Sequence, residues 1–201
     1  MYAKKRSVGL LVFDDVELLD FAGPFEVFGV ADELAGGNAF DVFTFAPAPG
    51  TVRTRHGLKI DPHHTLESCP AMDVIVIPGG FGTRALLRRP AVLEWIRQRS
   101  RQSEVIFSVC TGALVLAQLG MLDGLRVTTH ADCLAELAEI APAALIDPSR
   151  RFHDHGHILT SAGISAGIDA ALHLVGRLGG AEAAIAVARY MEYGEHATST
   201  S

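Results

Sequence analysis

The sequence predicts a single α/β domain, a three-layer sandwich in which a mostly parallel sheet lies between two layers of helices. Along its 201 residues, short runs of apolar and β-branched residues alternate with segments of helical periodicity. Residues 73–78 (Asp-Val-Ile-Val-Ile-Pro) are apolar on both faces, as is typical of a central parallel strand. Because no linker, repeat or low-complexity segment divides the chain, we expect one domain over residues 1–195 and a frayed tail over residues 196–201.

The individual elements follow from residue periodicity and from proline and glycine punctuation. Strands are expected where apolar residues run without helical spacing, at residues 8–13, 40–46, 73–78, 104–109 and 126–130. Helices are expected at residues 24–34, 90–101, 132–140, 164–179 and 181–193, and after Cys110 as far as Gly120. Pro90 favours a helix start, since the first helical turn does not need its missing N–H. Glycines at positions 50 and 57 predict a small hairpin at the sheet edge over residues 51–62, and the turn residues 154–156 predict another over residues 152–162.

Composition narrows the class of protein. Hydrophobic residues make up 49% of the chain, which is typical of a globular domain. A net charge of −6 argues against general nucleic-acid binding. We expect neither a signal peptide nor a membrane span, because the apolar stretches are too short. The three cysteines are an odd number and lack zinc-type spacing, so we expect no disulfide framework and a cytoplasmic protein.

The segment from Glu104 to Leu119 is the most informative part of the sequence. A β-branched run ends at Cys110, and small residues then open a helical pattern, which is the layout of a nucleophile elbow. A thiol near the positive end of a helix is expected to have a lowered pKa. The small residues Thr111-Gly112-Ala113 leave room for a substrate beside the sulfur. The alternative is a buried cysteine that acts only as a small apolar residue.

Other unusual residues follow neighbouring strands and are expected to converge on Cys110, because sites form at the carboxyl ends of parallel strands. Asp20 is either a helix cap or an acid–base group whose pKa burial raises, and Glu17 competes for the same role. Gly79 and Gly80 predict either an oxyanion-binding turn of backbone N–H groups or a tight turn without a ligand. His130 either supports the thiolate or satisfies a buried hydrogen bond.

A metal site is not expected in this chain. His153, His155 and His157 would share one face of a continuous strand, but Asp154 and Gly156 predict a turn that separates them. Cys69 and Cys133 are interpreted as structural, although Cys133 lies close enough to His130 in sequence to be considered as a resolving thiol.

The motifs together resemble those of the ThiJ/PfpI superfamily, across nearly the whole chain. They are Leu19–Pro24, Ile77–Gly80, Ser108–Gly112, Thr128–His130, Leu159–Gly163 and Ala166–Asp169. The resemblance implies a flavodoxin-like, class I glutamine amidotransferase-like fold and a homodimer. It also implies Cys110 as nucleophile, Asp20 as the neighbouring carboxylate, Thr111 beside the thiol, and an oxyanion pocket of backbone N–H groups near Gly80 and Thr111.

Within the superfamily, the Leu-Asp-x-x-Gly-Pro and Cys-Thr-Gly motifs most resemble the isonitrile hydratase branch and the amidotransferase-like domains of AraC-type regulators. Thr111 stands where protease-type members have a histidine, which weakens a peptidase interpretation. The chain ends at Ser201 without room for a helix-turn-helix region, so sequence-specific DNA binding is not expected.

The leading hypothesis is therefore an enzyme that needs no cofactor: a cysteine-dependent hydratase or hydrolase of a small electrophilic molecule. The favoured reaction is isonitrile hydration to an N-substituted formamide through a Cys110 thioimidate. Glyoxalase-like or amidase-like chemistry at the same thiol is an alternative, because pocket lining sets the choice of substrate. A ligand-binding or thiol-oxidation-sensing protein is the non-catalytic alternative, and a regulatory subunit acting through residues 182–193 is a third. We expect a small-molecule substrate and neither a nucleic-acid nor a membrane partner.

Overall fold

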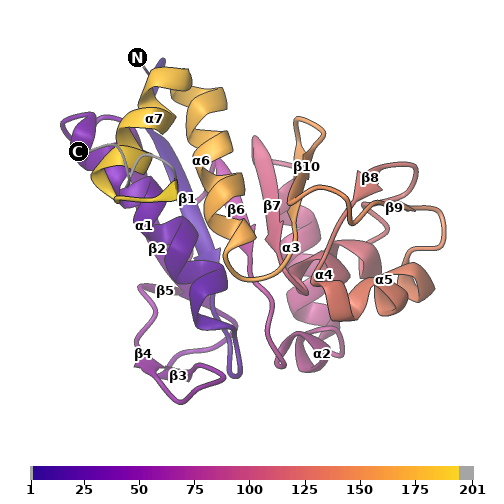
Figure 1. The fold of residues 1–201 in the computed structure, drawn as a ribbon. Helices are drawn as coiled ribbons and strands as arrows, with labels where there is room; N and C mark the ends of the chain where they lie inside the picture. Colours follow the sequence, from indigo (N-terminus) through magenta and orange to yellow (C-terminus); the bar gives the residue numbers. More distant parts are fainter. Residues whose placement is uncertain (1, 195–201) are drawn as a thin grey trace.

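The fold is that of a computed structural model in which residues 2–194 are described, so the predicted frayed tail at 196–201 lies outside the described residues. A seven-stranded sheet crosses the domain in the order β10-β11-β7-β6-β1-β2-β5 (Figure 1). Its strands are β10 (Phe152–Asp154), β11 (Ile158–Ser161), β7 (Val105–Val109), β6 (Val74–Ile77), β1 (Arg6–Leu11), β2 (Phe40–Ala46) and β5 (His64–Thr65). Neighbouring strands run parallel, apart from β10, which is antiparallel to β11. The predicted mostly parallel sheet is confirmed, with β6 in its centre.

Helices cover both faces of this sheet, which confirms the three-layer sandwich. On one face α1 (Leu18–Leu34), α6 (Ala166–Gly179) and α7 (Ala181–Tyr190) pack against one another (Figure 1). The remaining helices are α2 (Thr83–Leu86), α3 (Pro90–Ser100), α4 (Gly112–Gln118) and α5 (Leu134–Ile140), with a short 3₁₀ turn, η1 (Ala131–Cys133), before α5. Among these, α4 packs on β7 and β6 directly after the strand that leads into it.

Two small sheets lie apart from the central one. Strands β3 (Val52–Arg53) and β4 (Lys59–Ile60) form the predicted antiparallel hairpin, but as a separate sheet rather than at the central sheet's edge. Strand β8 (Arg126–Val127) pairs in parallel with β9 (Leu145–Ile146). The strand expected at residues 126–130 is therefore only two residues long and does not join the central sheet.

Helix α1 begins at Leu18, six residues before the start expected at Pro24. Pro24 instead lies inside the helix, where it cannot donate a hydrogen bond to the carbonyl of Asp20. Pro24 is the seventh residue of α1, beyond the first turn whose N–H groups have no intrahelical partner, so the helix loses one internal hydrogen bond at this position. The earlier start places Asp20 in the first turn of α1 rather than in a loop.

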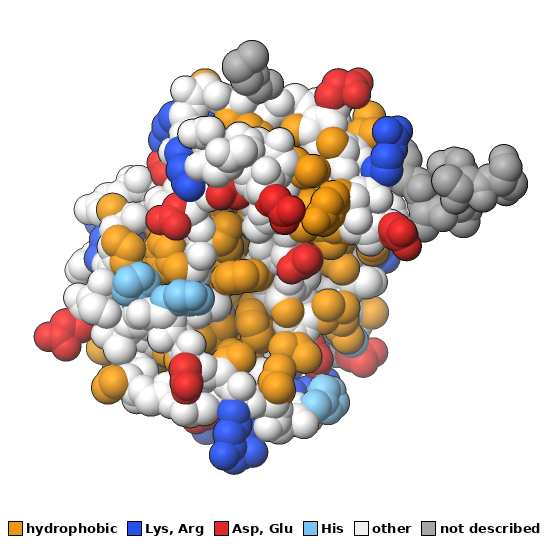
Figure 2. Space-filling model, turned by 90° about the vertical axis from the view of Figure 1, so that its left-hand side faces the viewer, with side chains coloured by type: hydrophobic (Ala, Val, Ile, Leu, Met, Phe, Trp, Pro, Cys, Tyr) orange, Lys and Arg blue, Asp and Glu red, His pale blue; other side chains and the backbone are white. Residues whose placement is uncertain are grey.

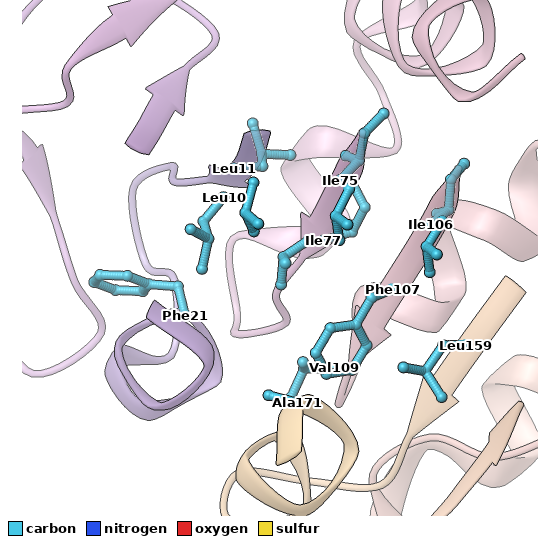
Figure 3. Close-up of a cluster of buried hydrophobic side chains, with 14 of the residues drawn as sticks. Leu10, Leu11, Phe21, Ile75, Ile77, Ile106, Phe107, Val109, Leu159 and Ala171 are labelled. Carbon is cyan, nitrogen blue, oxygen red and sulfur yellow. The ribbon is translucent and has the colours of Figure 1, made fainter. Parts of the chain in front are cut away.

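The core is formed on both faces of the central strands (Figure 3). Phe107 and Val109 of β7 point toward Ala171 of α6, while Ile106 lies on the opposite face of the same strand. Each of these β7 side chains is fully buried, so β7 is held rigidly up to the residue that precedes Cys110.

Hydrophobic side chains also gather on the outer face that carries α1 and α7 (Figure 2). The exposed large apolar residues of these two helices are Leu19, Leu34 and Tyr190. Over the described residues, none of the helices combines the length and the apolar character that crossing a bilayer requires.

Candidate active site

The site lies where the strand order reverses. The chain runs from β1 outward to β2 and β5, then returns to β6 on the other side of β1, so the connections after β1 and β6 lead toward opposite edges of the sheet. Ligands of open α/β sheets bind in the crevice that such a reversal creates. The two loops are joined by backbone hydrogen bonds, Glu17 N–H to Gly79 O (3.0 Å) and Gly82 N–H to Asp15 O (3.2 Å).

Two glycines allow this close approach. Gly80 has a φ of +126°, and a Cβ there would lie 2.4 Å from the carbonyl oxygen of Asp15. At Gly82 a Cβ would lie 1.9 Å from the carbonyl oxygen of Asp14. A side chain at either position would push the loops apart, so the predicted tight turn at residues 79–82 depends on glycine.

The predicted strand–turn–helix geometry is present at Cys110, while its role as a nucleophile stays a prediction. This residue has a φ of +55°, in the left-handed region that non-glycine residues rarely adopt, directly between β7 and α4. Its N–H is held by the carbonyls of Ser161 and Ala162, both at 3.2 Å, and its carbonyl accepts a hydrogen bond from Thr129 Oγ1 at 2.7 Å. The backbone on both sides of Cys110 is thus fixed by β11 and by the segment after β8.

Asp20 is completely buried beside this thiol. Its Oδ2 accepts the Gly79 N–H at 2.9 Å, and its Oδ1 is buried without a partner of good hydrogen-bond geometry. Burial raises the pKa of Asp20 to about 7, and the nearby charge of Glu17 acts in the same direction. The Gly79 N–H, the Cys110 thiol and the Ile164 N–H oppose this shift. The expected raised pKa of Asp20 is therefore supported, so this carboxyl holds a proton over part of the neutral range.

The expectation of a lowered thiol pKa at Cys110 is wrong. Burial raises the pKa of this thiol, and the negative charge of Asp20 raises it further, although the N–H groups of Thr111 and Ile164 act in the opposite direction. The residue is only 5% exposed, and loss of hydration is the largest contribution to this shift. Because one charge disfavours the other, Asp20 and Cys110 carry at most one negative charge between them near neutral pH.

Ile164 is a site residue that the sequence did not reveal. It has a φ of +51°, which is unusual for a β-branched residue, and its N–H reaches both Asp20 and Cys110. Its side chain is 37% exposed at the edge of the cavity. A backbone donor after β11 has no signature in the sequence, since any residue type except proline carries an N–H.

The N–H groups of Gly79 and Gly80 are already engaged within the chain. Gly79 donates to Asp20, and Gly80 donates to Thr111 Oγ1 at 3.0 Å. The same hydroxyl lies 3.1 Å from Thr83 Oγ1. Thr111 therefore organises the turn after β6, and the expected role of the two glycines as free oxyanion donors is not available in this arrangement.

A cavity of about 490 Å³ opens over the thiol. Its lining residues come from the loops after β1 and β6, from α2, from the turn between β7 and α4, from the β3–β4 hairpin and from the segments around η1 and before α6: Glu17, Arg55, Gly80, Phe81, Arg84, Cys110, Thr111, His130, Asp132, Cys133 and Ile164. Asp20 and Gly79 lie behind this lining. The cavity thus brings together most of the predicted site residues, in a space sized for a small molecule.

His130 reaches the cavity from outside the central sheet. Its Nδ1 accepts the N–H of Asp132 at 3.2 Å, and this hydrogen bond caps η1. Gly163 packs against the ring so closely that a Cβ there would lie 2.3 Å from His130 Cδ2. The hydrogen bond that His130 makes is therefore an exposed helix cap and not the buried one expected as the alternative, and a role in the chemistry stays a prediction.

Glu17 forms part of a second contact that the sequence did not predict. Its Oε2 accepts a hydrogen bond from Arg55 at 3.2 Å, and the Arg55 guanidinium stacks 3.7 Å from the centre of the Phe81 ring. Phe81 is 63% exposed at the mouth of the cavity. Arg55 lies at the tip of the β3–β4 hairpin, 38 residues from Glu17 in sequence, so only the fold brings the three side chains together.

The side chains of His153, His155 and His157 are separated from one another, as expected from the turn residues Asp154 and Gly156. Each ring nitrogen contacts a different backbone carbonyl: His153 that of Asp147, His155 that of Arg126 and His157 that of Glu104. Within residues 2–194 there is no group of three or more His, Cys, Asp or Glu side chains arranged to hold a metal ion. Cys69 is buried in the core, whereas Cys133 is half-buried in the wall of the cavity.

Residues 6–177 match the DJ-1/PfpI family, which is also called ThiJ/PfpI. The chain belongs to this family. An isonitrile hydratase of Pseudomonas putida is 35% identical over 187 residues, which are 93% of this chain and 78% of that protein. The HTH-type transcriptional regulator GbdR of Pseudomonas aeruginosa is 31% identical over 94% of this chain, which spans about half (51%) of the regulator's length.

Solved structures of the DJ-1/PfpI family have the same fold. A THiJ/PfpI family protein from Pseudomonas syringae superposes with a TM-score of 0.85 at 28% identity, covering 96% of this chain and 76% of that one. Drosophila melanogaster DJ-1beta gives a TM-score of 0.83 at 21% identity, covering 94% of this chain and 99% of that one, and this likeness concerns the fold alone. The similar proteins include one named as an enzyme and one named as a transcriptional regulator, so similarity alone does not assign a reaction to this chain.

Proposed function

We propose that this protein is an enzyme that hydrates isonitriles to N-substituted formamides. The observation that carries the proposal is the Cys110 thiol, presented by a left-handed turn against the buried Asp20, whose pKa is raised to about 7. Such a pair supplies a nucleophile and a proton donor at one point without a cofactor. The 35% identity to an isonitrile hydratase supports this choice of substrate over other electrophiles.

In the first step, Cys110 Sγ bonds to the terminal carbon of the isonitrile. Asp20 accepts the thiol proton and delivers it to the same carbon, so that R–N≡C becomes the thioimidate R–N=CH–S–Cys110. A carboxyl with a pKa near 7 suits both halves of this transfer, since it is neither too weak a base nor too weak an acid at neutral pH. No proton enters or leaves the site during this step.

In the second step, water adds to the thioimidate carbon. Asp20 removes a proton from the attacking water, the nitrogen becomes protonated, and the intermediate R–NH–CH(OH)–S–Cys110 forms. The hydroxyl proton then moves through Asp20 to the sulfur as the carbon–sulfur bond breaks. This releases R–NH–CHO and restores the thiol, so the sum is addition of one water molecule.

The test is formamide production by the purified chain from a simple alkyl isonitrile. We expect turnover by the wild type and by the Cys69→Ala variant, a matched control because Cys69 lies in the core, away from the cavity. Cys110→Ala should lose turnover completely while keeping its circular dichroism spectrum. Mass spectrometry of the wild type during turnover should show an adduct equal to one isonitrile on the peptide with Cys110. Turnover by Cys110→Ala would refute the mechanism.

If no isonitrile turns over, the same protein distinguishes the remaining functions. Production of hydroxy acids from glyoxals, or of ammonia from amides, would assign glyoxalase-like or amidase-like chemistry to Cys110. Stoichiometric oxidation of Cys110 by mild peroxide without turnover would favour an oxidation sensor, a role for which the neighbouring Asp20 is a suitable hydrogen-bond partner.

We further propose a cytoplasmic homodimer. The apolar face of α1 and α7 (Figure 2), with Leu34 and Tyr190 exposed, supports association between copies of the chain. Light scattering of the purified protein should give twice the mass of 21.4 kDa.

A further inference from the structure

Arg84 reaches the cavity with its charge already neutralised. It projects from α2, and its Nε donates to Glu136 Oε1 of α5 at 3.1 Å, while its Nη2 donates to Glu136 Oε2. The same Nη2 lies 3.3 Å from Cys133 Sγ. Arg84 and Cys133 line the cavity but Glu136 does not, so Glu136 holds the guanidinium from behind.

The charge of the second guanidinium in the cavity lining is also neutralised by a carboxylate. Arg55 is paired with Glu17 and stacks on Phe81. Both cations that face the cavity therefore have a carboxylate partner, and neither offers an unbalanced positive charge to an incoming group.

The other titratable groups around the cavity make it negative. Asp132 lines the cavity with a highly exposed carboxylate. The pair of Asp20 and Cys110 contributes at most one further negative charge. The Nδ1 of His130 accepts the backbone N–H of Asp132 at 3.2 Å and lies 3.8 Å from the carboxylate of Asp132, so this ring is engaged with its neighbour on the cavity wall. A carboxylate on a substrate would meet this negative potential and would also lose hydration against Phe81 and Ile164.

We propose that the cavity selects uncharged molecules over anionic ones, and that Glu136 enforces the selection by neutralising Arg84. Applied to substrates, the inference rests on the proposed function: the preferred isonitriles carry an uncharged nitrogen substituent, placed against the apolar side chains of Phe81 and Ile164. Glu136 acts through Arg84 and touches neither the substrate nor the thiol, so it is a positioning residue.

A pair of isonitriles that differ only in charge tests this selection. Methyl isocyanoacetate is neutral, and isocyanoacetate has the same skeleton with a free carboxylate. We expect the wild type to prefer the ester, and Glu136→Gln to improve kcat/KM for the carboxylate relative to the ester by about 3- to 10-fold, mainly through KM. The isosteric amide keeps the shape at position 136 and leaves Arg84 with an unbalanced positive charge.

A second measurement is independent of isonitrile chemistry. Iodoacetamide and iodoacetate alkylate the same thiol and differ in charge, and peptide mass spectrometry reports the rate at Cys110 alone. In the folded wild type, the ratio of the Cys110 alkylation rate with iodoacetamide to that with iodoacetate should exceed the same ratio in the urea-unfolded chain. Glu136→Gln should reduce this excess by a similar factor, about 3- to 10-fold.

Two further variants isolate the charge. Glu139→Gln changes an exposed carboxylate on the same helix that is not part of the cavity lining, so it should leave both ratios unchanged. The double variant Arg84→Gln/Glu136→Gln removes both charges and should return the preference toward wild type. Equal ratios in wild type and Glu136→Gln, or a folded preference no greater than the unfolded one, would overturn the inference. If neither isonitrile is hydrated, the proposed reaction fails, while the alkylation ratios still decide the charge selection.

Discussion

Replacing Asp20 with Asn should change the pH dependence of stability in a way that reports directly on the buried carboxyl. Burial raises the pKa of Asp20 from 3.8 to about 7, a shift of about three units. Each unit corresponds to about 1.4 kcal/mol, so ionising this carboxyl costs the folded state about 4 kcal/mol more than the unfolded chain. Between these two pKa values the folded chain keeps a proton that the unfolded chain has released. Wild-type stability should therefore fall as the pH rises through this window and level off above pH 7.

The Asn variant lacks this titration. Its free energy of unfolding, measured relative to wild type, should rise by about 4 kcal/mol between about pH 4 and about pH 8. Urea unfolding followed by the fluorescence of Trp95, the single tryptophan, measures both proteins at each pH. Asp123→Asn removes an exposed carboxylate in the loop between α4 and β8 and should follow the wild-type curve. Parallel curves for wild type and Asp20→Asn would show that Asp20 titrates normally and would refute the reasoning.

Two further substitutions test how the backbone holds the thiol. Gly112→Ala should destabilise the fold by about 1–3 kcal/mol and slow alkylation of Cys110, because the new Cβ would lie 1.9 Å from the carbonyl oxygen of Ile77. Urea unfolding measures the stability and peptide mass spectrometry measures the alkylation rate. An unchanged alkylation rate would contradict this prediction. Thr111→Val should lower the free energy of unfolding by about 1–3 kcal/mol, because the buried Gly80 N–H loses its acceptor. Calorimetry measures this loss. A matching Thr83→Val variant leaves the Gly80 hydrogen bond intact and should lower the stability less.

The features that the sequence predicts well are local ones. The β-branched run that ends at Cys110, followed by small residues, identified the elbow, since the left-handed turn needs uncrowded neighbours. The apolar run at residues 74–77 identified the central strand, because a strand covered on both faces has no polar side. The order of elements was predictable for the same reason, although the short elements β5, β9 and α2 carry too few residues to show a period.

The parts that escaped prediction depend on contacts between distant segments. Pro24 suggested a helix start, yet packing of α1 against α6 extends the helix six residues further toward its N-terminus. The thiol pKa at Cys110 is governed by burial beside Asp20, which lies 90 positions away in the chain. The pair of Arg84 and Glu136 joins two helices 52 residues apart, and neither residue belongs to a recognisable motif.

The two ends of the central sheet have a consequence for how the molecule behaves in concentrated solution. Its outermost strands, β5 and β10, contain only two and three residues. Exposed strand edges offer unpaired backbone groups to other chains, and long edges can seed fibrillar stacking. Edges this short present little backbone for such stacking, so the domain resists sheet-to-sheet aggregation even though five apolar parallel strands lie between them.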